Sequence, residues 1–144
     1  YKQRGGKKIL DAVLEVREEG MPKDGEDVHE AIEAKVIEKA GDAGMKMHTA
    51  RSRNDEVATC LRLFARDSLL HLAYSLLKLR EVLVRRAEEN LDVVMPGFTH
   101  LQYAQPTKLA HHLIAFHDMI KRDFQRCIDA FGRVNLCPLG SAAF

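Results

Sequence analysis

The sequence predicts an all-α protein in which two long antiparallel helices form part of an oligomeric helix bundle, preceded by a small N-terminal helical unit. Apolar residues recur every three or four positions through most of the 144 residues, and the run from Asn54 to Asn90 contains neither glycine nor proline. No segment alternates apolar and polar residues between hairpin turns. A chain of this length can form one ordinary domain with its own core.

Two short helices are expected first. One covers residues 7–19 and ends at residues 20–22, Gly-Met-Pro, because glycine and proline stop helical hydrogen bonding. The second begins after Asp27, which forms a capping-box pattern with Glu30 three residues later. Residues 41–44, Gly-Asp-Ala-Gly, are expected to close this helix.

The segment from Asn54 to about Asn90 predicts one very long helix. At a rise of ~1.5 Å per residue it would reach roughly 55 Å. Its apolar residues cover more than one face: Val57, Leu61, Phe64, Leu69, Leu72, Leu76, Leu79 and Leu83 on one side, and Leu63, Leu70, Leu77 and Val84 on another. A helix that is apolar on several sides is packed on several sides, so we expect a central bundle helix.

The second long helix is expected to follow a loop. Pro96 and Gly97 break the periodic pattern, residues 98–105 are interpreted as loop, and Pro106 restarts a helix for which Gly132 is the expected C-terminal cap. Its apolar stripe consists of Leu109, Leu113, Phe116, Ile120, Phe124, Ile128 and Phe131. These elements predict an N-terminal unit over residues 1–49 and a long-helix domain over residues 50–144, whose exposed apolar surface favours self-association.

Composition excludes several classes of protein. A net charge of +1 lacks the basic footprint of a nucleic-acid binder. The longest uncharged apolar run, residues 68–77, is too short to span a bilayer, and no signal peptide is evident. Three cysteines without C-x-x-C spacing favour a reducing cytoplasm over a disulfide framework, and the seven histidines have no ligand spacing that predicts a metal site. We expect no cofactor.

Residues 47–55, Met-His-Thr-Ala-Arg-Ser-Arg-Asn-Asp, concentrate polar chemistry just before the long helix. Two arginines can fork onto carboxylate or phosphate oxygens, and a helix N-terminus favours anions. One interpretation is an anion-binding corner. The alternative is a solvated polar cap of the kind that commonly begins a helix.

Four motifs in this chain resemble those of the argininosuccinate lyase family, within the fumarase/aspartase superfamily. They are Glu-Asp-Val-His at residues 26–29, His-Thr-x-Arg-Ser-Arg-Asn-Asp at 48–55, Met-Pro-Gly-Phe-Thr-His-Leu-Gln-Tyr-Ala-Gln-Pro at 95–106, and Asn-Leu-Cys-Pro-Leu-Gly-Ser-Ala at 135–142. They occur in the family's order. Ala50 and Ala142 stand where family members usually carry glycine.

The resemblance implies a reversible β-elimination that cleaves argininosuccinate to arginine and fumarate. Such a reaction needs cationic and amide donors for the developing negative charge, a base for the carbon-bound proton and an acid for the leaving nitrogen. In similar enzymes the histidine of Thr-His-Leu-Gln is the acid–base catalyst, which here is His100, and imidazole titrates near neutral pH. The resemblance implies that Thr99 binds substrate. On spacing alone, His100 would be a surface loop histidine.

The substrate-binding positions that the resemblance implies are Arg51, Ser52, Asn54 and His29. For His29 the alternative is a polar position in the first turn of a helix. His48 could touch substrate or pack at the helix entry. Arg53 and Asp55 are interpreted as structural residues that pair with each other or with neighbouring helices and shape the corner. His111, His112 and His117 are interpreted as solvent-facing or interfacial.

The family forms homotetramers in which three subunits build each active site, so the resemblance implies a shared site, a small-molecule substrate and a place in arginine biosynthesis. The family's flexible catalytic loop, Gly-Ser-Ser-x-Met-Pro-x-Lys-x-Asn-Pro, does not occur among the 144 residues. We therefore expect a fragment that is inactive by itself.

Two other classes stay open. One is a sibling such as adenylosuccinate lyase, fumarase or aspartase, against which the His-Thr-x-Arg-Ser-Arg-Asn-Asp string argues. The other is a non-catalytic helical protein like the lens crystallins that share the fold. An RNA-binding role for Arg51 and Arg53 is disfavoured by near-neutral charge and the lack of interleaved aromatic residues.

Overall fold

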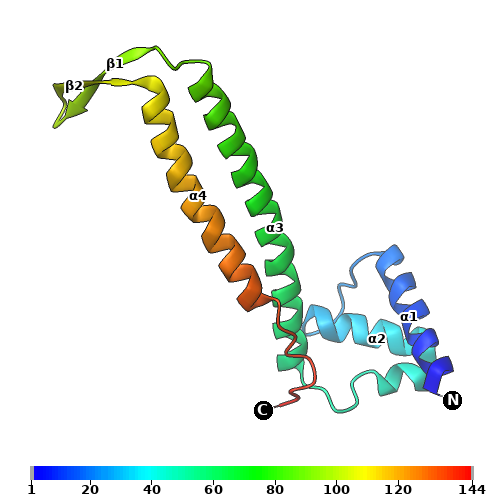
Figure 1. Ribbon diagram of the computed structural model, residues 1–144. Coiled ribbons are helices and arrows are strands. Elements are labelled where there is room, and N and C mark those ends of the chain that lie inside the picture. The colour runs from blue at the N-terminus through cyan, green and yellow to red at the C-terminus, as the bar shows by residue number, and fades with distance from the viewer. Residues whose placement is uncertain (1, 144) are drawn as a thin grey trace. The chain divides into compact units, whose positions relative to one another are not determined.

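The computed structural model describes residues 2–143 and confirms the all-α class. In chain order the elements are α1 (Lys2–Glu19), α2 (Val28–Ala40), the 3₁₀ helix η1 (Gly41–Lys46), α3 (Arg53–Glu88), the strands β1 (Val94–Thr99) and β2 (Gln102–Lys108), and α4 (Leu109–Val134) (Figure 1). They form two compact units. One contains the residues up to Thr59 together with those from Pro138 onward, and the other is Cys60–Cys137.

The first unit has a small hydrophobic core between α1 and α2. Ala12 and Val16 of α1 pack against Val36 of α2, which is completely buried. The partly buried side chains around this core are Ile9, Ile32, Ala40 and Met47. Helix α1 begins at Lys2, earlier than the predicted start at residue 7, and so includes two glycines.

Capping fixes both ends of α2. The Asp27 carboxylate accepts a hydrogen bond from the Glu30 N–H at 2.8 Å, and the Glu30 carboxylate accepts one from the Glu26 N–H at 2.7 Å. The backbone N–H of Glu30 holds the pKa of Asp27 below its usual value, because the bond stabilises the charged form. At the other end Gly41 adopts φ 57°, as a helix-ending glycine can, and η1 follows.

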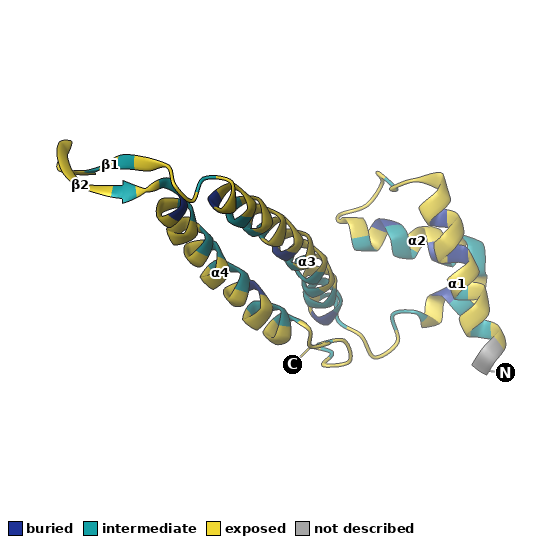
Figure 2. Cartoon of the chain, turned by 45° about the horizontal axis from the view of Figure 1, so that its top comes forward, coloured by how far each residue is buried: buried dark blue, intermediate teal, exposed yellow. Residues whose placement is uncertain are grey.

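The second unit consists of most of α3, the strands and α4. Helix α4 runs back alongside α3 (Figures 1 and 2), and Arg80 of α3 donates from Nε to His117 Nε2 of α4 at 3.3 Å. Near the end of α4, Arg62 donates to the carbonyl oxygens of Arg133 and Val134 at 3.2 and 3.3 Å. The long glycine-free helix and its antiparallel partner are thus confirmed.

Few side chains in this second unit are buried. The buried apolar residues described are Ala73, Ala87, Ala110 and Cys127. Much of both helices is exposed (Figure 2). The exposed large apolar residues include Leu61, Leu63, Phe64, Leu70, Leu72, Leu77, Ile114, Phe116, Met119 and Ile128. Two helices alone leave several apolar faces of α3 without neighbours.

The loop predicted over residues 98–105 is wrong, because this segment is a β-hairpin. Strands β1 and β2 pair antiparallel with Thr99 opposite Gln102 and an irregularity after Pro96. Nearly every side chain of both strands is exposed. Neither side of the hairpin packs on the buried cores described above. The sequence therefore lacks the apolar–polar alternation that would have predicted the strands.

The predicted bounds of α4 also need correction. Pro106 and the two residues after it lie in β2, and the helix begins at Leu109. Gly132 is not the cap, since the helix continues to Val134 and ends with Asn135 donating its N–H to the Phe131 carbonyl. Within residues 2–143, none of the helices has both the length and the apolar character needed to cross a membrane.

Candidate functional site

The predicted site residues belong to both units. In the first unit, the segment before α3 makes a sharp corner. Ala50 adopts φ 56°, a left-handed conformation that glycine accommodates most easily, which gives a physical reason for the glycine that the family usually carries there. The Ser52 hydroxyl then accepts a hydrogen bond from the Asn54 N–H at 3.2 Å, as a helix-capping side chain does.

Asp55 ties this corner to the segment after Pro138. The residue is 4% exposed, and its carboxylate accepts hydrogen bonds from the backbone N–H groups of Gly140 at 2.8 Å, Ala142 at 3.0 Å and Ser52 at 3.2 Å. These bonds, that from Gly140 foremost, hold the pKa of Asp55 below its usual value despite burial. Asp55 is therefore structural, as expected, and joins two of the four motifs.

Arg53 is the centre of a charged network between α2 and the first turn of α3. Its guanidinium donates to Glu33 at 3.2 Å and to Glu56 at 3.2 Å, and its Nε lies 3.8 Å from an Asp27 oxygen. These contacts are the expected pairing of Arg53 with a neighbouring helix. Arg53 has no contact with Asp55 among the described ion pairs.

Each of the two glutamates also contacts a histidine. His48 Nδ1 lies 2.9 Å from Glu33 Oε2, and His29 Nδ1 lies 3.0 Å from Glu56 Oε1. All four side chains are partly buried. The sequence interpretation missed both glutamates, although Glu33 stands four residues after His29 on the same helix, a spacing that places both on one face.

A cavity of about 220 Å³ opens beside this network. Its lining residues are Glu33, Met47, His48, Arg51, Glu56 and Leu139. Of the predicted substrate-binding residues in this unit, Arg51 lines the cavity, and His29 contacts a lining carboxylate. Ser52 and Asn54 follow Arg51 at the corner without lining this cavity. The walls offer carboxylate oxygens, an imidazole and a guanidinium, which suits a small polar ligand that carries both charges.

In the second unit, Thr99 and His100 lie at the tip of the hairpin. His100 and Leu101 form the two-residue turn with φ 48° and 61°, the left-handed pair typical of a type I′ hairpin turn. Residues other than Gly, Asn and Asp adopt this backbone conformation at an energetic cost. Such backbone strain is concentrated at functional sites. Both Thr99 and His100 are exposed.

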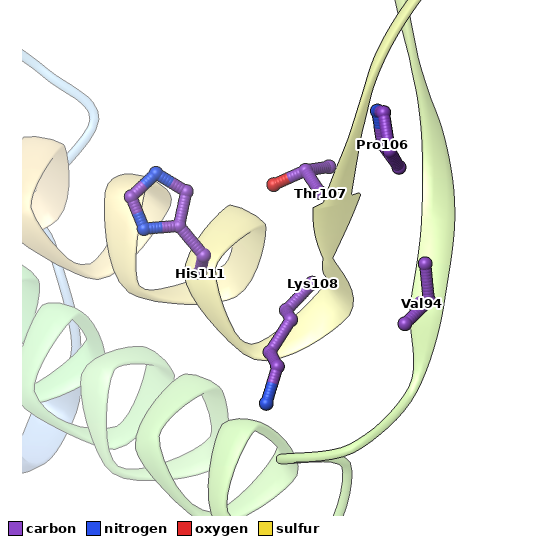
Figure 3. A pocket seen from close by; sticks show the side chains of 5 residues that line it. All are labelled: Val94, Pro106, Thr107, Lys108 and His111. Atoms are coloured by element: carbon purple, nitrogen blue, oxygen red, sulfur yellow. The ribbon is translucent and has the colours of Figure 1, made fainter.

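An open hollow of about 460 Å³ lies at the other end of the hairpin (Figure 3). It is lined by Val94, Pro106, Thr107, Lys108 and His111 (Figure 3). The Lys108 ammonium lies 3.5 Å from the Asp92 carboxylate. His100 does not line this hollow, and none of the predicted site residues does.

Comparison with known proteins gives this chain a family. The model of the family described as Lyase (Lyase_1) matches residues 4–144. The chain belongs to this lyase family. The resemblance drawn from the four motifs is thereby confirmed, as is the description of the lyase chain as a partial one: it spans about three tenths of the length of the curated relatives it matches.

Two of these relatives are argininosuccinate lyases from archaea. The lyase chain is 61% identical over 140 residues to that of Archaeoglobus fulgidus, covering 96% of this chain and 29% of the relative. It is 54% identical over 147 residues to that of Methanosarcina mazei, covering 99% of this chain and 30% of the relative.

Solved structures give the same architecture. An EDDS lyase in complex with formate superposes with a TM-score of 0.86 at 36% identity, over 94% of this lyase chain and 27% of that chain. A fumarate lyase from Mesorhizobium sp. BNC1 superposes with a TM-score of 0.68 at 26% identity, over 72% of this chain and 24% of that one. The helical fold of the lyase chain is therefore the fold of this group.

Within the part of the lyase chain that the structure describes, no three or more His, Cys, Asp and Glu side chains gather in a way suited to a metal ion. The polar groups of the site are instead engaged with one another. The chemistry they offer is charge pairing, hydrogen bonding and proton transfer.

Proposed function

We propose that this lyase chain is part of an argininosuccinate lyase, a carbon–nitrogen lyase that reversibly cleaves argininosuccinate to arginine and fumarate. The observation that carries the proposal is the 61% identity to a relative of that name, over 96% of this chain. The reaction removes a proton from the carbon next to a carboxylate and breaks the bond to the guanidinium nitrogen. A carbon–carbon double bond forms, and the leaving nitrogen gains a proton.

Substrate recognition is assigned to Arg51, Ser52, Asn54, Thr99 and His29. Arg51 carries a permanent positive charge on a cavity wall, where it can form a bidentate pair with a substrate carboxylate. Ser52 and Asn54 supply small polar groups beside it at the start of α3. The amide and hydroxyl donors would stabilise the extra negative charge that develops when the proton is removed.

Proton transfer is assigned to His100. Its imidazole stands on a strained two-residue turn and is exposed, so it can reach a substrate held elsewhere in an assembly. The neighbouring Thr99 hydroxyl would hold the same substrate. Neither residue lines either of the two cavities described above, which supports a site completed by another subunit.

A homotetramer with shared active sites is the assembly we propose. It is supported by the exposed apolar faces of α3 and α4, which a larger bundle would bury. Such an enzyme would act in arginine biosynthesis in the cytoplasm. A crystallin-like protein of the same fold would assemble in the same way but release no fumarate.

The decisive experiment measures fumarate release by the whole polypeptide that contains this chain. Argininosuccinate, adenylosuccinate and EDDS are supplied in turn, and the ultraviolet absorbance of the product is followed. We expect turnover of argininosuccinate above the other two, and His100→Asn to lower kcat by roughly 10²–10⁴-fold. His71→Asn, at an exposed position of α3, is the matched control and leaves kcat unchanged.

Two outcomes contradict the proposal. Preferred turnover of adenylosuccinate or EDDS would assign the chain to a sibling enzyme. A correctly assembled protein with no turnover of any of the three would favour the crystallin-like alternative. Full activity in His100→Asn would refute the assignment of proton transfer to this residue.

A further inference from the structure

Arg53 connects two histidines through two carboxylates. One of its terminal nitrogens donates to Glu33 and the other to Glu56, each at 3.2 Å. Glu33 in turn contacts His48, and Glu56 contacts His29, in both cases at the ring atom Nδ1. The two histidines are 19 positions apart in the sequence, in different elements, and share this single cation.

The charges of this network determine which ring nitrogens carry protons. At neutral pH an arginine side chain is protonated and a glutamate carboxylate is ionised. An ionised carboxylate only accepts hydrogen bonds. Each imidazole must therefore donate from Nδ1, which leaves Nε2 of a neutral ring as a hydrogen-bond acceptor and base.

We propose that Arg53 is a positioning residue that fixes the Nδ1–H tautomer and the orientation of both His48 and His29. The carboxylates would act on the rings in the way that outer-shell carboxylates orient the histidines of metal and catalytic sites. His48 and Arg51 both line the cavity. In this tautomer Nε2 of the His48 ring is the hydrogen-bond acceptor and base. Only the consequence for catalysis rests on the proposed lyase function.

Two separate carboxylates must be bound at once at this position, which requires the shape of arginine as well as its charge. Its planar fork can donate to two separate carboxylates at once, whereas lysine is a point charge on a flexible stem. Lysine at this position would keep the cation but would not hold both glutamates in fixed positions. The effects of the two glutamates can also be measured independently, because each glutamate contacts one histidine.

The test reads the tautomers directly by long-range ¹H–¹⁵N NMR of the ¹⁵N-labelled chain, at a pH where the imidazoles are neutral. In the wild type we expect His48 and His29 to show the Nδ1–H pattern, while exposed His71 shows an averaged one. In Arg53→Met at least one of the two rings should show the averaged pattern. In Arg53→Lys the Nδ1–H pattern should be kept in part. Arg51→Met, which removes a neighbouring cation without touching either glutamate, should change neither tautomer.

Two further variants keep the test informative if Arg53→Met does not fold. Glu33→Gln should alter the tautomer of His48 alone, and Glu56→Gln that of His29 alone. An Nε2–H pattern for either ring in the wild type, or two unchanged tautomers in a folded Arg53→Met, would overturn the inference. So would equal effects of Glu33→Gln on both rings.

Activity measurements separate this inference from the proposed function. In the whole polypeptide, Arg53→Met should lower kcat/KM by roughly 10–100-fold, as loss of an orienting outer-shell group does, with partial recovery in Arg53→Lys. Tautomers as expected in a protein without lyase activity would refute the function and leave the positioning role intact. An active enzyme in which His48 and His29 show averaged tautomers would refute the positioning role alone.

Discussion

At the scale of single residues, a few side chains join segments that are far apart in the sequence. Asp55 accepts three backbone N–H groups, two of them from the segment 85 and 87 positions away. A carboxylate with several backbone donors is strongly stabilised in its charged form. Asp55 therefore links the start of α3 to the segment after Pro138 most strongly while it is ionised.

This linkage predicts a pH dependence of stability. Because the pKa of Asp55 is lowered on folding, its contribution is complete above the unfolded-state value of about 3.9 and is lost as pH falls through the folded pKa. We expect the urea midpoint of the wild type to fall as the pH is lowered below about 4. Asp55→Asn should have a lower midpoint already at pH 7 and a smaller further loss on acidification.

Asp11→Asn, at an exposed position of α1, is the control for that measurement and should leave the midpoint at pH 7 unchanged. Equal acid dependence in Asp55→Asn and the wild type would contradict the role given to this carboxylate.

Ala50 provides a second prediction at this scale. Its φ of 56° puts an alanine Cβ in the left-handed region, which costs roughly 1–2 kcal/mol for residues other than glycine. Ala50→Gly should therefore raise the free energy of unfolding by about 0.5–1 kcal/mol, after allowing for the greater freedom of glycine in the unfolded chain. Urea denaturation would measure the change.

The matched control is Ala58→Gly, the same substitution inside α3, which should lower the free energy of unfolding by about 1 kcal/mol. Effects of the same sign at both positions would mean that backbone strain at Ala50 is not relieved by glycine.

At the scale of elements, the hairpin formed by β1 and β2 determines where Thr99 and His100 lie. The strands approach closely at Gly97, where an added methyl group would lie 2.5 Å from the Gln105 carbonyl oxygen. Contacts that short do not occur without displacement of the backbone. The absence of a side chain at Gly97 is therefore a condition for the hairpin and for the turn at its tip.

Gly97→Ala should disturb the hairpin while leaving the helices intact. We expect amide NMR signals of residues 94–108, including those of Thr99 and His100, to shift or broaden, with an unchanged helical circular dichroism signal. In Gly132→Ala the added methyl meets nothing within 4 Å. That control should retain the hairpin signals and gain about 0.5–1 kcal/mol of stability, since alanine is the better helix former. An unperturbed hairpin in Gly97→Ala would contradict the close approach.

At the scale of the whole molecule, the second unit has more apolar surface than it can bury. Leu61, Phe64 and Leu72 of α3 are 63%, 73% and 49% exposed, and Phe116 of α4 is 44% exposed. Large exposed apolar side chains of this kind are typical of surfaces that bind another protein when they gather in one patch. Self-association would remove this apolar surface from water.

Association is therefore expected at the concentrations used for chromatography with light scattering. The measured mass should exceed the 16.3 kDa of one chain, with a tetramer as the proposed end point. Phe64→Glu should lower the measured mass, because it places a charge on the exposed face of α3. Met21→Glu, equally exposed but between α1 and α2, should leave the mass unchanged. A monomer at every concentration would contradict the proposed assembly.

Much of the fold could be predicted because its signals are local. The capping pair of Asp27 and Glu30, the stop at Gly20 and the uninterrupted apolar periodicity of α3 each involve residues within a few positions of one another. The hairpin could not be predicted, since its strands are exposed on both faces and carry no alternation. The family resemblance distinguished a substrate-binding Arg51 from a structural Arg53, but the cavity that Arg51 lines could not be predicted from the sequence.

The helices, their order, the family and the short segments that carry the polar groups can all be predicted from the sequence. That Glu33 and Glu56 join His48 and His29 through Arg53, and that Asp55 holds the segment after Pro138, becomes visible only in the folded chain. The physical reason is that helix formation depends on neighbouring residues, whereas these bonds join groups up to 87 positions apart. Such pairs are specified only when folding brings their elements together.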